Sequence, residues 1–238
     1  MNQIARLARL FTPGLAAADR ALTAALRAEG LTYLADERFA TMARELRRID
    51  AAGLAGEVVE FGVAGGGSAV FLARRARPAR RFMGFDLFGQ IPPPGPQDPP
   101  EAHARHAEIT AGRSQGLNGK TYYGYVEDLL GQVTRVLDQH GVPVDGQAVS
   151  LVPGLFDDTV PGHLPERIAL AHVDCDWFDP VLRCLHGVAP RMLPGAAVVL
   201  DDYSDWEGCR RAADQFLAAN KDFRLTQLRP NAVIRRIA

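Results

Sequence analysis

Short apolar runs that alternate with helical segments constrain the fold of this chain more than any other feature. Five runs are expected to be buried strands: 57–61, 80–86, 148–154, 168–174 and 196–202. Apolar residues at helical spacing, glycine-rich turns and a helix-starting proline lie between them; helices are expected over roughly 37–52, from about Ser68, over 126–137, after Pro180 and around 209–216. Strands that alternate with helices form a parallel sheet covered on both faces. The sequence therefore predicts one doubly wound α/β domain.

Both ends of the chain extend this pattern. At the N-terminus, Ile4, Leu7, Leu10 and Phe11 share one face of a short helix. At the C-terminus, "FRLTQLRPNAVIRRI" contains two β-like runs around a turn, which predicts a closing hairpin. We therefore expect residues 1–55 to be an N-terminal helical extension, serving as a lid or an oligomer interface, and 56–238 to be the main domain. The proline-rich "GQIPPPGPQDPP" begins a long irregular insertion, about 89–125, of the length typical of lids.

Composition and charge exclude several classes of protein. Hydrophobic residues make up 47% and charged residues 23%, which is globular. The formal net charge of −1 gives no indication of nucleic acid or an anionic membrane as a partner. No stretch approaches the ~20 apolar residues of a membrane span, and Arg6, Arg9 and Pro13 interrupt any signal-peptide core. The three cysteines lack metal-type spacing, which favours a reducing compartment. We expect a cytoplasmic protein.

Acidic residues close four of the predicted strands. Glu60 follows the first apolar run, Asp86 the second and Asp174 the fourth, while Asp201 and Asp202 follow the fifth. In doubly wound sheets, ligands bind beyond the carboxyl ends of the strands. A single aspartate at such a position often caps the next helix instead. Four acidic strand ends in one sheet indicate a ligand site.

The glycine-rich turn "EFGVAGGGS" after the first strand suggests an adenosine cofactor. Such turns let backbone approach a ligand at a helix N-terminus, although dehydrogenases, flavoproteins and methyltransferases all use one. An acid before the first glycine, Glu60, suits a positively charged ligand such as S-adenosylmethionine better than a pyrophosphate. Asp86 is placed to take ribose hydroxyls.

The later acids indicate a hard cation. Asp174, Asp201 and Asp202 supply only oxygen, which fits Mg²⁺, whereas zinc prefers histidine or cysteine. His172 is expected to pack in the core. A metal-bound hydroxyl has a lowered pKa, and Asp176 is placed to remove its proton.

Several segments together resemble one family. "GEVVEFGVAGGGSAVFLA", "GFDLFGQIPPP", "LVPGLFDDTVP", "HVDCDWFDPVLRCL" and "MLPGAAVVLDDYSDWEGCRRAADQF" occur in the order seen in the macrocin O-methyltransferase family. Its members are Mg²⁺- and S-adenosylmethionine-dependent enzymes that methylate sugar hydroxyls, often on glycosylated natural products. The resemblance implies a class I methyltransferase-like Rossmann fold with a mostly parallel seven-stranded sheet. We also expect a homodimer or higher homo-oligomer and a small-molecule acceptor.

The resemblance also implies roles for individual residues. The metal ligands would be Asp174, Asp201 and Asp202, and the general base Asp176. The cofactor would contact Glu60, Gly62, Val63, Gly66, Ser68, Asp86, Phe156 and Asp157. The insertion would be a substrate lid, in which Tyr122, Tyr123 and Tyr125 either line an acceptor site or pack locally.

Three other functions compete with this interpretation. A catechol- or phenol-directed methyltransferase would use the same metal site, but the related catechol-type enzymes carry a lysine where this chain has Trp177. An NAD-dependent oxidoreductase is disfavoured by Glu60 and by the lack of a nearby Tyr-x-x-x-Lys. A catalytically silent binding protein is disfavoured because unused buried carboxylates are costly to keep ionised.

Overall fold

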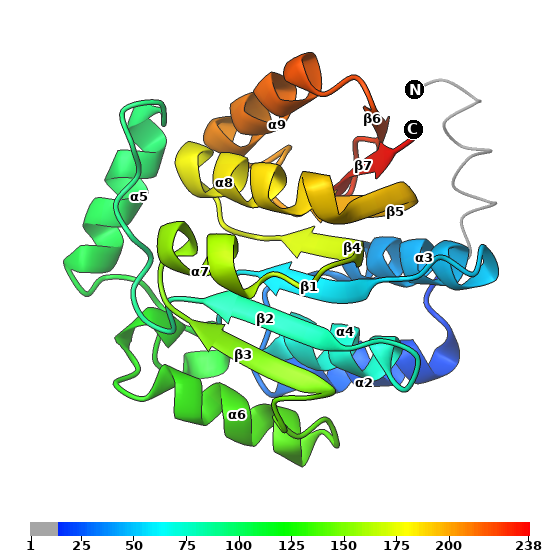
Figure 1. The fold of residues 1–238 in the computed structure, drawn as a ribbon. Helices are drawn as coiled ribbons and strands as arrows, with labels where there is room; N and C mark the ends of the chain where they lie inside the picture. The colour runs from blue at the N-terminus through cyan, green and yellow to red at the C-terminus, as the bar shows by residue number, and fades with distance from the viewer. Residues whose placement is uncertain (1–13) are drawn as a thin grey trace, which may run out of the picture.

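A seven-stranded sheet is the centre of the molecule (Figure 1). The computed structural model describes residues 14–238, so the helix predicted at Ile4–Phe11 lies outside the described residues. The strand order is β3-β2-β1-β4-β5-β7-β6, and the strands are β1 (Glu57–Phe61), β2 (Phe82–Asp86), β3 (Val149–Pro153), β4 (Ile168–Val173), β5 (Met192–Leu200), β6 (Phe223–Gln227) and β7 (Ala232–Arg236). The first five run parallel, and β6 and β7 form the antiparallel hairpin at the C-terminus. This confirms the predicted fold class.

Helices cover both faces of the sheet. On one face lie α2 (Ala17–Ala28), α3 (Asp36–Ala51), α4 (Gly67–Ala76) and α6 (Leu129–Gln139); on the other lie α7 (Phe156–His163), α8 (Phe178–Val188) and α9 (Glu207–Ala219). All six residues of the central strand β4 are buried because both of its faces are covered. Among the described residues, no helix is long and apolar enough to cross a membrane.

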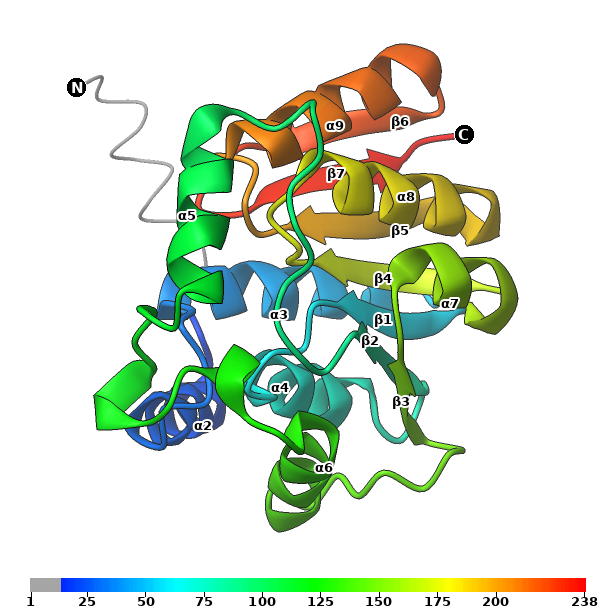
Figure 2. The ribbon, with the colours of Figure 1, turned by 90° about the vertical axis from the view of Figure 1, so that its left-hand side faces the viewer.

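The insertion contains a helix that the sequence analysis did not predict. α5 (Pro100–Thr110) lies across the carboxyl ends of the strands (Figure 2), followed by 3₁₀ turns at Leu117–Gly119 and Tyr123–Tyr125. Proline is compatible with a first helical position, where its missing N–H costs nothing. The proline-rich run 89–100 is therefore followed by a helix, whose first residue is Pro100, and not by further irregular chain. The short helix α7 was also missed, because its Pro161 obscured the pattern.

A buried ion-pair cluster attaches α3 to the C-terminal hairpin. Glu45 of α3 is fully buried and accepts hydrogen bonds from Arg235 Nη2 at 2.8 Å and from Arg48 Nε at 3.0 Å. Burial alone would raise the pKa of Glu45, but the hydrogen bonds from Arg235 and Arg48 outweigh it and lower the pKa. The ionised carboxylate is therefore the form that stabilises this junction.

Replacing Glu45 by Gln should lower the free energy of unfolding by about 2–3 kcal/mol at pH 7, because Arg44, Arg48 and Arg235 lose their ion-pair partner. A folded-state pKa below the unfolded value of about 4.3 makes this stabilisation present above that pH and lost as the pH falls through the folded value. Urea denaturation at pH 7 and at acid pH measures both effects. The surface pair Arg105–Glu108, at 3.3 Å, provides the control Glu108→Gln, expected to change stability by less than about 0.5 kcal/mol. Equal losses of unfolding free energy in Glu45→Gln and Glu108→Gln would contradict the stabilising role assigned to the Glu45 carboxylate.

Candidate active site

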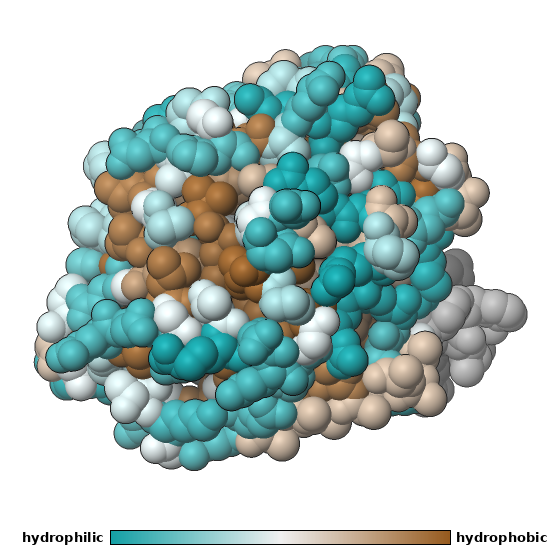
Figure 3. Space-filling view, turned by 60° about the horizontal axis from the view of Figure 1, so that its bottom comes forward, coloured by the Kyte–Doolittle hydropathy of each residue, from teal (hydrophilic) through white to brown (hydrophobic). Residues whose placement is uncertain are grey.

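A cleft of about 1170 Å³ lies beyond the carboxyl ends of the parallel strands. The chain after β2 and helix α5 pass in front of these strand ends (Figure 2). Cleft-lining residues follow β1, β2, β3, β4 and β5, as expected for a doubly wound sheet. Ordinary small-molecule pockets are smaller, roughly 300–1,000 Å³, so this one has room for two ligands. On the face drawn in Figure 3, hydrophobic residues gather left of centre among hydrophilic ones.

Three carboxylates meet in the cleft. Asp174 follows β4 directly, and Asp201 and Asp202 follow β5. These strands are parallel neighbours, with Val173 opposite Leu200 in the ladder, so the residues after them emerge side by side. One oxygen from each carboxylate lies within 4.8 Å of the other two. The structure thus brings together the three residues predicted as metal ligands.

The electrostatics of this cluster fit a divalent cation. Burial raises the pKa of Asp174 well above its usual range, and repulsion from Asp201 and Asp202 adds to the effect. Burial likewise raises the pKa of Asp202, with repulsion from Asp176 and Asp201. A cation bound among these oxygens would offset both the repulsion between the carboxylates and the cost of burying their negative charge. Carboxylate oxygens are the donors that Mg²⁺ prefers, so the residues present fit this ion.

Asp176 lies beside the cluster in a strained conformation. Its φ is 56°, a left-handed value that few non-glycine residues adopt. Its backbone N–H donates to Asp202 Oδ2 at 3.2 Å. Burial, followed by repulsion from Asp201, raises the pKa of Asp176 to about 6. Strain of this kind gathers at functional sites, and a pKa near neutrality suits a general base.

An arginine from the N-terminal helical segment completes the cluster. Arg38 of α3 donates to the Asp201 carbonyl at 2.8 Å and also pairs with the carboxylates of Asp201 and Asp205. From the other side, Asn231 Nδ2 donates to Asp201 Oδ1 at 2.6 Å. Sequence reasoning missed both residues, because neither belongs to a local motif and only the folded chain places them beside Asp201.

The glycine loop is packed against the protein's own backbone. Gly62 has a φ of 89°, and a Cβ there would lie 1.8 Å from the Asp174 carbonyl oxygen. Gly67 meets the Leu31 carbonyl oxygen in the same way, at 2.6 Å. These glycines are therefore required by close contacts within the chain, besides any approach to a ligand. Gly62 lines the cleft, whereas the cleft lining does not include Val63, Gly66 or Ser68.

Glu60 lies one residue inside β1 rather than at its end. Its side chain is fully buried and does not line the cleft. His172 Nδ1 donates to Glu60 Oε1 at 2.9 Å. Burial alone would lower the pKa of His172, but Asp201 and Glu60 raise it to about 10. His172 is buried as expected, with its Nε2 3.8 Å from Asp201 Oδ1. A contact between Glu60 and a cofactor stays a prediction.

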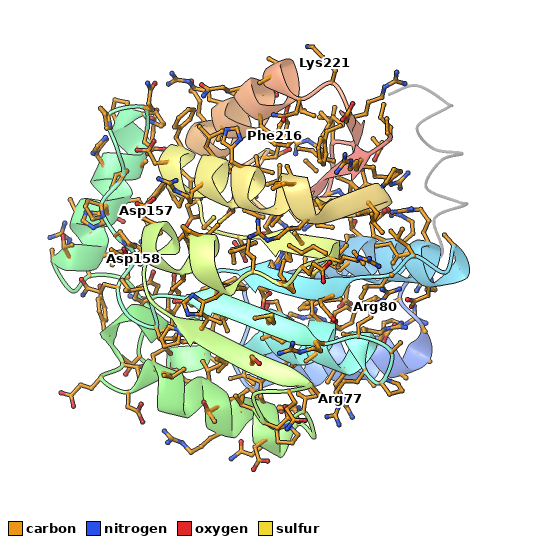
Figure 4. All side chains as sticks on the ribbon, viewed as in Figure 1. Arg77, Arg80, Asp157, Asp158, Phe216 and Lys221 are labelled. Atoms are coloured by element: carbon orange, nitrogen blue, oxygen red, sulfur yellow. The ribbon has the colours of Figure 1, made fainter. Side chains whose placement is uncertain are left out.

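Three further residues that were predicted to contact the cofactor line the cleft: Asp86, Phe156 and Asp157. Asp86, at the end of β2, accepts from the N–H groups of Val63 at 2.7 Å and Ala64 at 3.0 Å. Burial raises the pKa of Asp86, and these backbone groups oppose the rise. Phe156 and Asp157 begin α7 and also line the cleft; Asp157 lies near the carboxyl ends of the strands (Figure 4).

The three tyrosines of the insertion have different positions. Tyr122 and Tyr123 line the cleft, and their rings are 4.4 Å apart between centroids. Tyr125 does not line it; its hydroxyl donates to the Ile109 carbonyl at 2.6 Å and accepts from Ser114 N–H at 3.1 Å. Tyr125 therefore packs locally, whereas Tyr122 and Tyr123 line the cleft.

The sheet order, its C-terminal hairpin and the ligand cleft define a class I methyltransferase fold. The chain belongs to the macrocin O-methyltransferase family (TylF), which it matches over residues 7–227. The solved structure of the O-methyltransferase NovP has the same fold, with a TM-score of 0.72, 21% identity and coverage of 90% of this chain and 87% of NovP.

Two curated relatives are named as O-methyltransferases. The first, an 8-demethyl-8-(2,3-dimethoxy-alpha-L-rhamnosyl)-tetracenomycin-C 4'-O-methyltransferase of Streptomyces olivaceus, is 31% identical over 69% of this chain. The second, a mycinamicin III 3''-O-methyltransferase of Micromonospora griseorubida, is 28% identical over 69% of this chain. The matched stretch spans 59% of the length of the first relative and 61% of the second.

Proposed function

We propose that this protein is an O-methyltransferase that takes its methyl group from S-adenosylmethionine, requires a divalent cation such as Mg²⁺, and methylates a hydroxyl of a sugar or glycosylated small molecule. One observation carries the proposal: Asp174, Asp201 and Asp202 converge beside Asp176 at the carboxyl ends of two neighbouring strands. Membership of the macrocin O-methyltransferase family supports the reaction class.

In this proposal Asp174, Asp201 and Asp202 hold the cation. A bound divalent cation supplies Lewis-acid polarisation of an acceptor hydroxyl. Arg38 and Asn231 hold the Asp201 carboxylate in place from two sides. Such supporting contacts orient metal ligands and tune their affinity.

Asp176 acts as the general base. It accepts the proton of the acceptor hydroxyl while that oxygen takes the methyl group, which leaves S-adenosylhomocysteine as the second product. Its backbone link to Asp202 fixes the base relative to the metal ligands. Close positioning of the base and the reacting groups supplies a large part of such rate enhancements.

The cofactor half of the cleft lies between β1, β2 and the start of α7. Gly62, Asp86, Phe156 and Asp157 line it, and Asp86 is placed to accept from ribose hydroxyls. The acceptor half has aromatic walls, with Tyr122 and Tyr123 on one side and Trp177 and Trp206 lining it elsewhere. Aromatic faces suit the C–H surfaces of sugar rings, and the two curated sugar methyltransferases support this acceptor class.

Methyl transfer from radiolabelled S-adenosylmethionine tests the proposal. The acceptors are methyl α-L-rhamnopyranoside, methyl β-D-glucopyranoside and catechol, each with Mg²⁺ and with EDTA. We expect label on a glycoside, loss of transfer in EDTA and recovery when Mg²⁺ is returned. Transfer that EDTA leaves unchanged would contradict the cation requirement. Transfer to catechol alone would identify a phenol-directed enzyme instead.

A further inference from the structure

The proline-rich segment 89–99, called the strap below, crosses the open end of the sheet. It runs from β2 across the carboxyl ends of the neighbouring strands towards α9, where α5 begins and turns back (Figure 2). Ile91, Pro92 and Pro93 of the strap line the cleft. The strap is therefore part of the wall around the acceptor half.

Asp98 connects the strap to the loop that carries Asp176. Asp98 is only 7% exposed. Its Oδ1 accepts from Phe178 N–H at 2.8 Å, and its Oδ2 accepts from Gly95 N–H at 2.9 Å. Phe178 is the first residue of α8, so a carboxylate distant in sequence caps this helix. Breaking the contact would leave the buried Phe178 N–H and the half-buried Gly95 N–H without acceptors.

Further contacts hold the strap on either side of Asp98. Trp177 Nε1 donates to the Pro92 carbonyl at 3.0 Å. On α9, Arg211 donates to the Gln97 carbonyl at 2.7 Å and to its side-chain oxygen at 2.9 Å. A Cβ on Gly208 of α9 would lie 2.0 Å from Asp98 Oδ1, so the helix touches the anchor directly.

We propose that Asp98 is a positioning residue that fixes the strap as a permanent wall of the acceptor half, separate from any moving lid. The strap is anchored to Trp177 and Phe178, which directly follow Asp176 in the chain. The wall of the acceptor half and the proposed general base are therefore held next to each other. Proline restricts the unfolded chain and so lowers the entropy lost on fixing the strap. That the acceptor binds against this wall rests on the proposed function; that the wall is fixed does not.

The consequence for specificity is an acceptor surface that is formed before binding. An acceptor must present an apolar face to Ile91, Pro92 and Pro93, because these side chains cannot withdraw while Asp98 holds the strap. Preformed walls lower the ordering cost of binding. Any lid motion is then confined to the chain beyond the strap, from α5 to about residue 125.

Hydrogen–deuterium exchange with mass spectrometry tests the anchor. In the ligand-free protein, the amides of Gly95 and Asp98 in the peptide covering 89–99, and of Phe178 in the peptide covering the start of α8, should already be protected, because these N–H groups are hydrogen-bonded. S-adenosylhomocysteine with Mg²⁺ should change their exchange little. Asp98→Ala should accelerate exchange in both peptides about tenfold or more. The matched control is Asp128→Ala, which removes the cap of α6 (Gly131 N–H to Asp128 Oδ1, 2.9 Å) without touching the cleft. It should leave strap exchange unchanged.

Tryptophan fluorescence gives a second readout in the same variants. The chain has two tryptophans, Trp177 and Trp206, whose ring centroids are 5.1 Å apart beside the strap. Asp98→Ala should shift their emission to longer wavelength and increase acrylamide quenching, with unchanged circular dichroism as evidence of folding. Trp177→Phe, which removes the indole donor to Pro92 and part of the buried ring, should loosen the strap less than Asp98→Ala in the exchange experiment.

Two results would overturn the proposal. One is fast strap exchange in the ligand-free protein that becomes slow only with S-adenosylhomocysteine and Mg²⁺, which would make the strap a lid. The other is strap exchange in folded Asp98→Ala equal to that of the unsubstituted protein. Failure of the unsubstituted protein to bind S-adenosylhomocysteine would instead refute the proposed function, with the strap result unaffected.

Discussion

Replacing Asp174 by Asn is expected to lower methyl transfer by about three orders of magnitude or more, because one of three cation ligands is lost. Asp202→Asn should act in the same direction. S-adenosylhomocysteine affinity should stay within about threefold, since the cofactor half is formed by other strand ends. Mg²⁺ titration calorimetry measures the lost cation affinity independently of turnover.

The same substitution should raise the stability of the metal-free protein. Burial and repulsion raise the pKa of Asp174 in the folded state, so its ionised form opposes folding at neutral pH. A neutral Asn removes that penalty, and thermal unfolding in EDTA should occur at a higher temperature. The control is Asp158→Asn, at an exposed position of α7 that does not line the cleft (Figure 4). It should change neither methyl transfer nor the unfolding temperature in EDTA. A collapse of S-adenosylhomocysteine binding in Asp174→Asn would contradict the division into two halves.

Replacing Asp176 by Asn should lower the turnover number by about 10²–10⁴-fold, the usual contribution of a general base. Asparagine tolerates a positive φ, so the backbone conformation at this position should be kept. The N–H that donates to Asp202 is also kept. Affinities for S-adenosylhomocysteine and Mg²⁺ should therefore stay within about threefold of the unsubstituted values.

Steady-state kinetics with saturating cofactor, together with calorimetry on both ligands, distinguishes a base from a structural residue. A structural role would weaken ligand binding along with turnover. Turnover within about tenfold of the unsubstituted enzyme would show that another group takes the proton.

The sequence predicted what short-range patterns determine. β4 and β5 were recognisable as buried strands, and parallel neighbours must present their carboxyl ends together. The convergence of Asp174, Asp201 and Asp202 was therefore predictable before any coordinates. The hairpin of β6 and β7 was predictable from two β-like runs around a turn.

Contacts between segments distant in the chain were not predictable. Arg38 reaches Asp201 from a helix that reads as an ordinary amphipathic segment. Glu60 contacts His172, and only strand pairing between β1 and β4 makes that neighbour visible. Asp98 carried a local signal, an aspartate between prolines that is typical of turns, but nothing local indicated the N–H of Phe178 as its partner.

Calorimetric titration of S-adenosylhomocysteine into the purified protein, with Mg²⁺ and with EDTA, tests the central claim most directly. We expect micromolar binding that survives EDTA, and a separate Mg²⁺ binding event that Asp174→Asn removes. Absence of S-adenosylhomocysteine binding under both conditions would contradict it, and the carboxylates at the strand ends would then need a different ligand.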